Sequence, residues 1–154
     1  MIRHPRGFTV IEAVMVVAII GLLTLISYPR LAVLNATTDL HSAGHRLAST
    51  VTVARGAAIR RGRHAFFNQN GSTIWVTVDT GGVDPDTVLG KVALDSVYGV
   101  TIVRPTAPTV IDFDPRGIGN NSNTVMTKFY LSKNGYTDSI CVSRLGDVRK
   151  GCTI

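Results

Sequence analysis

The sequence predicts an α+β fold, in which one long N-terminal helix packs against an antiparallel β-sheet. An apolar run occupies residues 8–28, an apolar stripe at helical spacing continues to Arg61, and two β-favouring segments each contain an Asn-Gly pair. The first half of the helix is therefore expected to span a membrane, and the second half to be amphipathic. The 154 residues leave room for one domain and an appendage, since a domain usually takes roughly 100 to 150 residues.

The apolar run from Phe8 to Tyr28 has 21 residues and one charge, Glu12. At a rise of about 1.5 Å per residue it is long enough to cross a hydrocarbon core about 30 Å thick. The preceding leader MIRHPRG is basic and has no acidic residue, which predicts that it stays in the cytoplasm while the C-terminal domain crosses the membrane. A cleavable secretory signal is the alternative, but its apolar region is shorter, has no carboxylate and ends at a small-residue site.

Glu12 is a candidate functional residue, because a carboxylate at the centre of a membrane helix costs about 2.5 to 3.5 kcal/mol on insertion scales. A cationic amine of a second subunit at the same depth would offset much of that cost, since the attraction is strong where the dielectric is low. Glu12 would then fix the register of neighbouring helices. The alternative is that Glu12 lies at the level of the lipid headgroups.

The helix is expected to continue after the apolar run and to end near Arg61. Pro29 lacks a backbone donor and predicts a kink or a local break. Beyond it, apolar residues recur at helical spacing and predict the face that a sheet covers: Leu40, Ala43, Leu47, Val51, Ala54 and Ala58. Small residues such as Gly44 in this region allow a sheet to approach closely.

The sequence after the helix predicts an antiparallel sheet. Two hairpins are expected around the pairs Asn70-Gly71 and Asn134-Gly135, because Asn-Gly between β-favouring runs is a strong turn signal. Further strands are expected at 100–103 and 109–113. Residues 81–96 are expected to form a loop with a short strand.

Charge and cysteine content leave two questions open. Lys and Arg outnumber Asp and Glu by 16 to 10, which can favour an anionic partner but is more often only a solubility feature. The two cysteines, Cys141 and Cys152, allow one pairing. A disulfide is expected if the domain is exported, and two free thiols if it is not.

Gly7, the following residues FTVIE, the apolar run and Pro29 together resemble the class III signal of type IV prepilins and type II secretion pseudopilins. The resemblance implies that a prepilin peptidase cuts between Gly7 and Phe8 and methylates the new Phe8 amine. In this family the carboxylate corresponding to Glu12 pairs with the N-terminal amine of a neighbouring subunit.

The resemblance also implies a type IV pilin-like domain plan and a location. Residues 1–7 would be a cleaved leader, residues 8–29 the transmembrane and later filament-core half of the helix, and residues 30–154 a periplasmic globular domain that includes the rest of the helix. The chain would be a single-pass protein of the bacterial inner membrane before it enters a pilus or pseudopilus. Its implied partners are other pilins or pseudopilins, the prepilin peptidase and the inner-membrane assembly machinery.

Three later segments resemble the GspH/FimT branch of this superfamily: LASTVTVARGAAIRRGRHAFF, IDFDPRGIGN and ICVSRLGDVRKGC. The branch implies a minor, FimT- or FimU-like pilin that is a structural subunit in type IV pilus assembly or in its tip complex. The alternative is a GspH-like minor pseudopilin of type II secretion. Some members bind DNA through a basic turn in the tail, which would correspond here to Arg144, Arg149 and Lys150. Asp147 stands where that pattern has a cation, and it opposes this activity.

No pattern in the sequence predicts an enzyme, a catalytic residue, a cofactor or a metal site. His41 and His45 have the spacing that lets two imidazoles share a metal, but no third ligand is evident, so a solvated face is the better interpretation. Asp112 and Asp114 alternate along an expected strand as paired acids do. A strand that runs into the DPRG turn explains them equally well.

Overall fold

The computed structural model describes residues 9–82, 84–104, 109–120 and 126–152, except for the side chains at 26–32 and 104. The chain divides into two units, Met1–Asn35 and Ala36–Ile154. Helix α1, Val10–Arg61, contributes to both units and ends at the residue expected from the sequence. The side chain of Pro29 lies outside the described residues, so the kink remains a prediction.

The first unit is the apolar start of α1. Its large apolar side chains are exposed on every side of the helix, from Val10 at 83% to Leu25 at 75%. Thr9 caps the start of the helix, because its hydroxyl accepts a hydrogen bond from the Glu12 N–H at 3.3 Å and so satisfies one of the free donors of the first turn. Among the described residues, no helical stretch meets the length and hydropathy needed to cross a membrane. Of the predicted span at 8–28, residue 8 and the side chains of residues 26–28 lie outside the described part.

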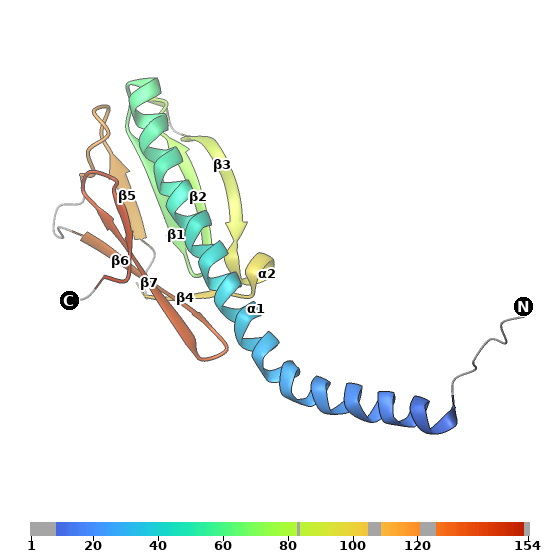
Figure 1. The fold of residues 1–154 in the computed structure, drawn as a ribbon. Coiled ribbons are helices and arrows are strands. Elements are labelled where there is room, and N and C mark those ends of the chain that lie inside the picture. Colours follow the sequence, from blue (N-terminus) through green and yellow to red (C-terminus); the bar gives the residue numbers. More distant parts are fainter. Residues whose placement is uncertain (1–8, 83, 105–108, 121–125, 153–154) are drawn as a thin grey trace, which may run out of the picture. The chain divides into compact units, whose positions relative to one another are not determined.

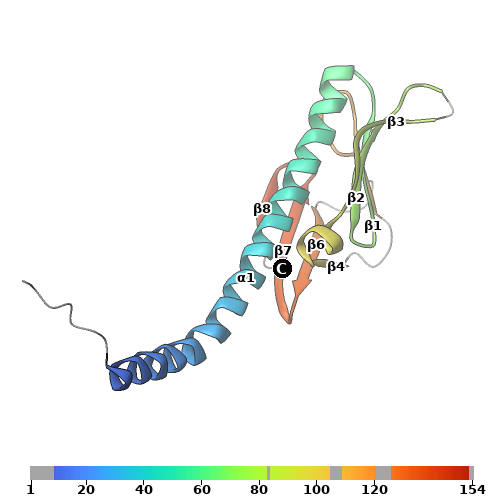
Figure 2. The ribbon, with the colours of Figure 1, turned by 90° about the vertical axis from the view of Figure 1, so that its right-hand side faces the viewer.

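The second unit contains two four-stranded antiparallel sheets with the C-terminal half of α1 packed against both (Figures 1 and 2). The first sheet has the order β3-β2-β1-β5 and the second the order β4-β6-β7-β8. Their strands are β1 Ala65–Asn70, β2 Thr73–Val78, β3 Asp86–Ala93, β4 Thr101–Arg104, β5 Thr109–Phe113, β6 Met126–Lys133, β7 Tyr136–Ser143 and β8 Val148–Lys150. A short helix, α2 Leu94–Tyr98, lies between β3 and β4.

The predicted apolar stripe of α1 forms one side of the core. Every one of its members is no more than 3% exposed: Leu40, Ala43, Leu47, Val51, Ala54 and Ala58. Phe67 of the first sheet and Phe129 of the second meet edge to face, with ring centroids 5.8 Å apart. The helix and both sheets therefore share a single hydrophobic core.

Gly44 shows how closely the helix approaches the second sheet. A Cβ atom at this position would lie 3.0 Å from Cδ1 of Ile140 on β7. The expectation that a small residue permits close approach is thus confirmed at Gly44. Gly56, further along the same helix, would place its Cβ with nothing within 4 Å.

Both predicted hairpins are present. Asn134 and Gly135 have φ values of 50° and 82° and join β6 to β7, in the left-handed conformation that a two-residue hairpin turn requires. The first hairpin turns one residue later than the Asn-Gly pair, because Asn70 pairs with Thr73 and the connection is Gly71-Ser72.

Two expectations differ from the structure. The sequence predicts one sheet, but β4 pairs with β6 and β5 pairs with β1, so the two strands that are neighbours in sequence enter different sheets. The loop expected at 81–96 is instead largely the eight-residue strand β3 followed by α2. Irregular register with β2 breaks the alternation along β3, and the buried side chain of Leu94 anchors α2.

We expect Gly44→Leu to lower the free energy of unfolding by about 1–3 kcal/mol, because the added atoms would overpack the contact with β7. Gly56→Leu is the matched control, and it should leave stability unchanged or raise it by up to about 1 kcal/mol through helix propensity. Denaturant unfolding of the full-length chain in detergent measures both. Equal effects of the two substitutions would contradict close packing at Gly44.

Candidate functional site

The connection between β7 and β8 is a tight turn formed by residues 143–147, which we call the basic turn. The N–H of Gly146 donates to the carbonyl of Ser143 at 2.9 Å, and the N–H of Ser143 donates to the carbonyl of Asp147 at 2.9 Å. The Ser143 hydroxyl also accepts the Asp147 N–H at 3.1 Å. Gly146 has a φ of 70°, which a side chain would strain. The turn is therefore closed by its own hydrogen bonds.

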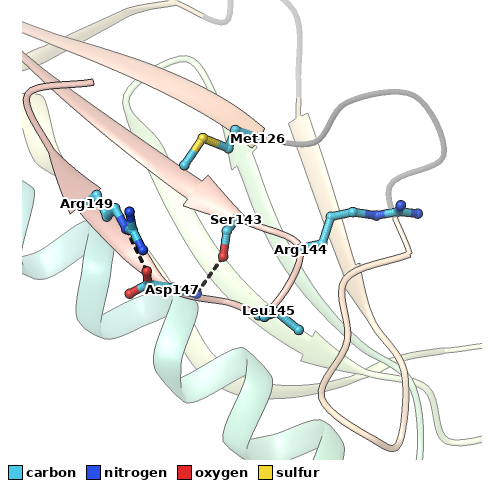
Figure 3. A pocket seen from close by; sticks show the side chains of 6 residues that line it. All are labelled: Met126, Ser143, Arg144, Leu145, Asp147 and Arg149. Carbon is cyan, nitrogen blue, oxygen red and sulfur yellow. Dashed lines mark hydrogen bonds and ion pairs between the residues drawn. The ribbon is translucent and has the colours of Figure 1, made fainter. Parts of the chain in front are cut away.

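The three candidate cations around this turn point in different directions. Asp147 accepts a hydrogen bond from Nε of Arg149 at 2.8 Å, so the acid noted in the sequence neutralises the nearest cation (Figure 3). Arg144 extends away from this pair, and it has no ion pair within the described residues. Nζ of Lys150 lies 3.2 Å from Nδ1 of His41 on α1. The structure thus brings Arg144 and Arg149 to one turn but directs Lys150 toward the helix.

A hollow of about 330 Å³ adjoins the basic turn. Leu145, which is 62% exposed, and Met126 supply apolar atoms to its wall. Side chains from β6, β7, β8 and the turn line it: Met126, Ser143, Arg144, Leu145, Asp147 and Arg149 (Figure 3). Its chemistry is mixed: one cation is partly neutralised, the other has no acidic partner among the described residues, and aliphatic surface is exposed beside them.

A disulfide joins Cys141 on β7 to Cys152 just beyond β8, with the two Cα atoms 6.2 Å apart. The backbone of Gly151 also donates to the carbonyl of Ser139 at 2.9 Å. These links hold an edge strand that has only three residues. The pairing expected for an exported domain is therefore present, and it fixes the strand that carries Arg149 and Lys150.

The N-terminal candidate site is described only in part. Gly7 and Phe8 lie outside the described residues, so the cleavage site remains a prediction. Glu12 is exposed, and its carboxylate has no hydrogen-bond or ion-pair partner within the described residues. Thr9 is a contributing residue that the sequence interpretation missed, although the pattern Thr-x-x-Glu before an apolar run is a recognised capping signal.

The two histidines with metal-like spacing have different neighbours in the structure. His41 faces β7, where its Nδ1 lies 3.9 Å from a carboxylate oxygen of Asp138. His45 lines a different hollow, together with Arg46 and Tyr98. Within the residues that the structure describes, no three His, Cys, Asp or Glu side chains gather as metal ligands do.

Asp112 and Asp114 do not act as a pair. Nδ1 of His64 lies 2.9 Å from a carboxylate oxygen of Asp112. The Asp114 carboxylate instead accepts the backbone N–H groups of Arg116 and Ile118, at 2.9 and 2.8 Å, and so shapes the following turn. The hydrogen bond with Asp112, helped by its charge, raises the pKa of His64 above 6.5. Sequence reasoning missed His64, because the contact joins residues that are 48 positions apart.

Comparisons with known proteins agree with this architecture. Residues 43–146 match the family model of the type II transport protein GspH, and residues 2–28 match the prokaryotic N-terminal methylation motif. No curated protein matches this chain in sequence.

Two crystal structures of the type IV minor pilin FimU from Pseudomonas aeruginosa are similar in fold. The form in space group P21 has 18% sequence identity and a TM-score of 0.57, over 75% of this chain and 90% of that chain. The form in space group P65 has 19% identity and a TM-score of 0.54, over 73% of this chain and 93% of that chain. At this level of identity the likeness concerns the fold.

We expect the pair formed by His64 and Asp112 to make stability depend on pH. The folded-state pKa of His64 lies above the unfolded value, so the stabilisation is complete below about pH 6.5 and is lost as pH rises through the folded pKa. The pair is partly exposed, with side chains 41% and 25% accessible, so the effect should be about 0.2–1 kcal/mol.

Unfolding of the wild type and of Asp112→Asn between about pH 5.5 and 8.5 measures this effect, since that range brackets the ordinary histidine pKa. Asp112→Asn and His64→Gln should each remove the same part of the pH dependence of the free energy of unfolding. His45→Asn, which changes a histidine on another surface, is the matched control and should keep the wild-type profile. An unchanged pH profile in Asp112→Asn would exclude the pair as its source.

Proposed function

The chain belongs to the GspH family of type II transport proteins, and from that premise we propose that it is a minor pilin, a structural subunit in type IV pilus assembly or of the pilus tip complex. The methylation motif over residues 2–28 implies that the chain is processed at its N-terminus and anchored in a membrane. The observation that carries the proposal is Glu12: one carboxylate, without a partner among the described residues, in an otherwise uncharged helical segment.

In this proposal the prepilin peptidase removes residues 1–7 and methylates the amine of Phe8. Residues 8–29 hold the subunit in the bacterial inner membrane as a single pass, and residues 30–154 fold in the periplasm. The disulfide between Cys141 and Cys152 supports an exported domain, because disulfides persist in oxidising compartments. The helix then leaves the membrane when the assembly machinery extracts the subunit.

Glu12 would pair with the Phe8 amine of a neighbouring subunit. The part of its own helix near Glu12 supplies no Lys or Arg, since the described segment from Thr9 to Leu25 contains neither. Pairing in a low-dielectric surrounding offsets the cost of the buried charge and sets the relative register of the two helices. The exposed apolar side chains around Glu12 would pass from contact with lipid to contact with other helices, so no large apolar surface is left in water.

The second assembly that fits this family is the pseudopilus of type II secretion, in which the chain would be a minor pseudopilin. The match to a type II transport protein favours it. The alanine and arginine near the helix end, Ala54-Arg55, resemble the GspH/FimT branch as a whole and do not separate the two assemblies. Deleting the gene in its native host separates the two: loss of surface pili with normal secretion supports the pilus, and the reverse supports the pseudopilus.

We expect Glu12→Ala to be cleaved normally but to enter filaments at least about tenfold less than the wild type, because the buried charge pair that fixes register is lost. Co-expression with a prepilin peptidase, followed by mass spectrometry, should give a chain shortened by the leader with a methylated Phe8 in both proteins. Immunoblots of sheared filaments measure incorporation.

Thr24→Ala is the matched control, because it removes a polar side chain of the same segment whose hydroxyl donates to the Gly21 carbonyl of its own helix. It should assemble like the wild type. Normal incorporation of Glu12→Ala would show that the carboxylate does not fix register. An intact N-terminus in the wild type would overturn the processing itself.

A second candidate function is DNA binding at the basic turn, favoured by the exposed Arg144 without an acidic partner among the described residues. Lys150 and Arg149 add positive charge nearby, but Arg149 is already paired with the Asp147 carboxylate. Binding of this kind would depend on phosphate contacts, which carry little sequence information and weaken with salt.

If the basic turn binds DNA, Asp147→Asn should strengthen binding, because it releases Arg149 from its carboxylate. Arg144→Ala and Arg149→Ala should weaken binding and reduce the slope of log affinity against log salt by about 0.9 for each phosphate that is no longer neutralised. Mobility-shift titrations of the full-length chain in detergent at several salt concentrations measure both quantities. Arg60→Ala, at an exposed arginine of α1, is the control. Absence of a shift in the wild type and in Asp147→Asn would exclude this site.

A further inference from the structure

Two glycine-containing turns from different sheets contact each other. Residues 114–119, which we call the glycine turn, follow β5 of the first sheet, and the basic turn follows β7 of the second. The N–H of Gly119 donates to the carbonyl of Arg144 at 2.6 Å. A Cβ atom on Gly119 would lie 3.1 Å from that same oxygen. The two turns therefore meet backbone to backbone, where a side chain on Gly119 would push them apart.

Arg55 of α1 contacts both turns with one side chain. Its Nε donates to the carbonyl of Gly117 in the glycine turn at 3.2 Å. A Cβ atom added to Gly146 in the basic turn would lie 2.8 Å from Cδ of Arg55. Both glycines have positive φ values, 77° for Gly117 and 70° for Gly146, and both are buried. The close packing and the backbone conformation thus require glycine at the same two positions.

The surroundings of Arg55 leave it little freedom. The side chain is half-buried, and Ile59, one turn further along α1, lies 2.7 Å from the position of a Gly117 Cβ. Phe113, at the end of β5, lies 3.3 Å from the position of a Gly146 Cβ. A charged donor bound to a carbonyl in such a place makes a stronger hydrogen bond than a neutral one. Arg55 is thus held by both turns, through the Gly117 carbonyl and through close packing at Gly146.

We infer that Arg55 is a positioning residue that couples the glycine turn to the basic turn, so that the two turns open and close as one unit. The helix supplies the rigid element, and each turn is ordered partly by the other through Arg55 and the Gly119 to Arg144 hydrogen bond. Arg144 is presented to solvent from this unit. The coupling is independent of which partner the basic turn meets, so it stands or falls apart from the proposed function.

Amide hydrogen exchange of the full-length, isotope-labelled chain in detergent tests the coupling. In Arg55→Met, which keeps the aliphatic contact but removes the donor, the amides of Gly117, Gly119 and Gly146 should all exchange about tenfold faster or more, as expected for loss of a charge-assisted hydrogen bond. Amides of the β1–β2 hairpin should change by less than about twofold, because that hairpin lies outside the two turns. Arg55→Lys should give a smaller increase, since it retains a donor.

Two further variants sharpen the result. Arg60→Met is the matched control, because Nε of Arg60 donates at 3.2 Å to the carbonyl of Gly56 within its own helix, and it should leave both turns protected. Gly146→Ala should speed exchange at Gly117 and Gly119 as well as in its own turn, because coupling acts in both directions.

Three results would overturn the inference. Faster exchange in the glycine turn alone after Arg55→Met would mean that the turns are ordered independently. A uniform increase across all amides would make Arg55 a general stabiliser of the fold. An equal increase in amide exchange of both turns after Arg60→Met would show that Arg55 is not specifically responsible for the coupling.

Discussion

The packing of one apolar stripe of α1 against two sheets is the constraint on which the globular unit depends. Leu47, Val51 and Ala54 are fully buried on this stripe, and the side chains that cover them come from both sheets. Burying a large apolar side chain contributes about 1.5–3 kcal/mol, so the helix and the sheets stabilise one another. Because Arg55 of α1 lies against both the glycine turn and the basic turn, the same packing also positions these two turns.

The two units of the chain bury their apolar residues in different ways. Beyond Ala36 most apolar side chains of α1 lie on one face and are covered by the chain's own strands, while Ile59 is 49% exposed. Before Asn35 the apolar side chains that the structure describes surround the helix and are exposed, so a bilayer or other helices must cover them. Glu12 lies in this second kind of environment, which is why its partner is expected from another subunit and not from within the chain.

Several charges in the globular unit make internal contacts. Nζ of Lys133 on β6 lies 2.6 Å from a carboxylate oxygen of Asp39 on α1. His64 is hydrogen-bonded to Asp112, and Arg149 to Asp147. Each contact joins elements that are already close, and partly exposed pairs of this kind contribute little stability individually. Each such ion pair leaves the net charge unchanged, so the positive surplus of the sequence is carried by cations outside these pairs.

The sequence by itself determined the local elements: α1 and its buried stripe, both hairpins, the cysteine pair that could bond, and the N-terminal motif with Glu12. Each depends on nearby residues, through helical periodicity, Asn-Gly turn chemistry or a continuous apolar run. The tertiary structure alone decided the separation into two sheets, the length of β3, the pairing of His64 with Asp112 and the place of Arg55 between two turns. These depend on contacts between distant residues, whose positions follow from how the layers pack and leave no periodic signal in the sequence.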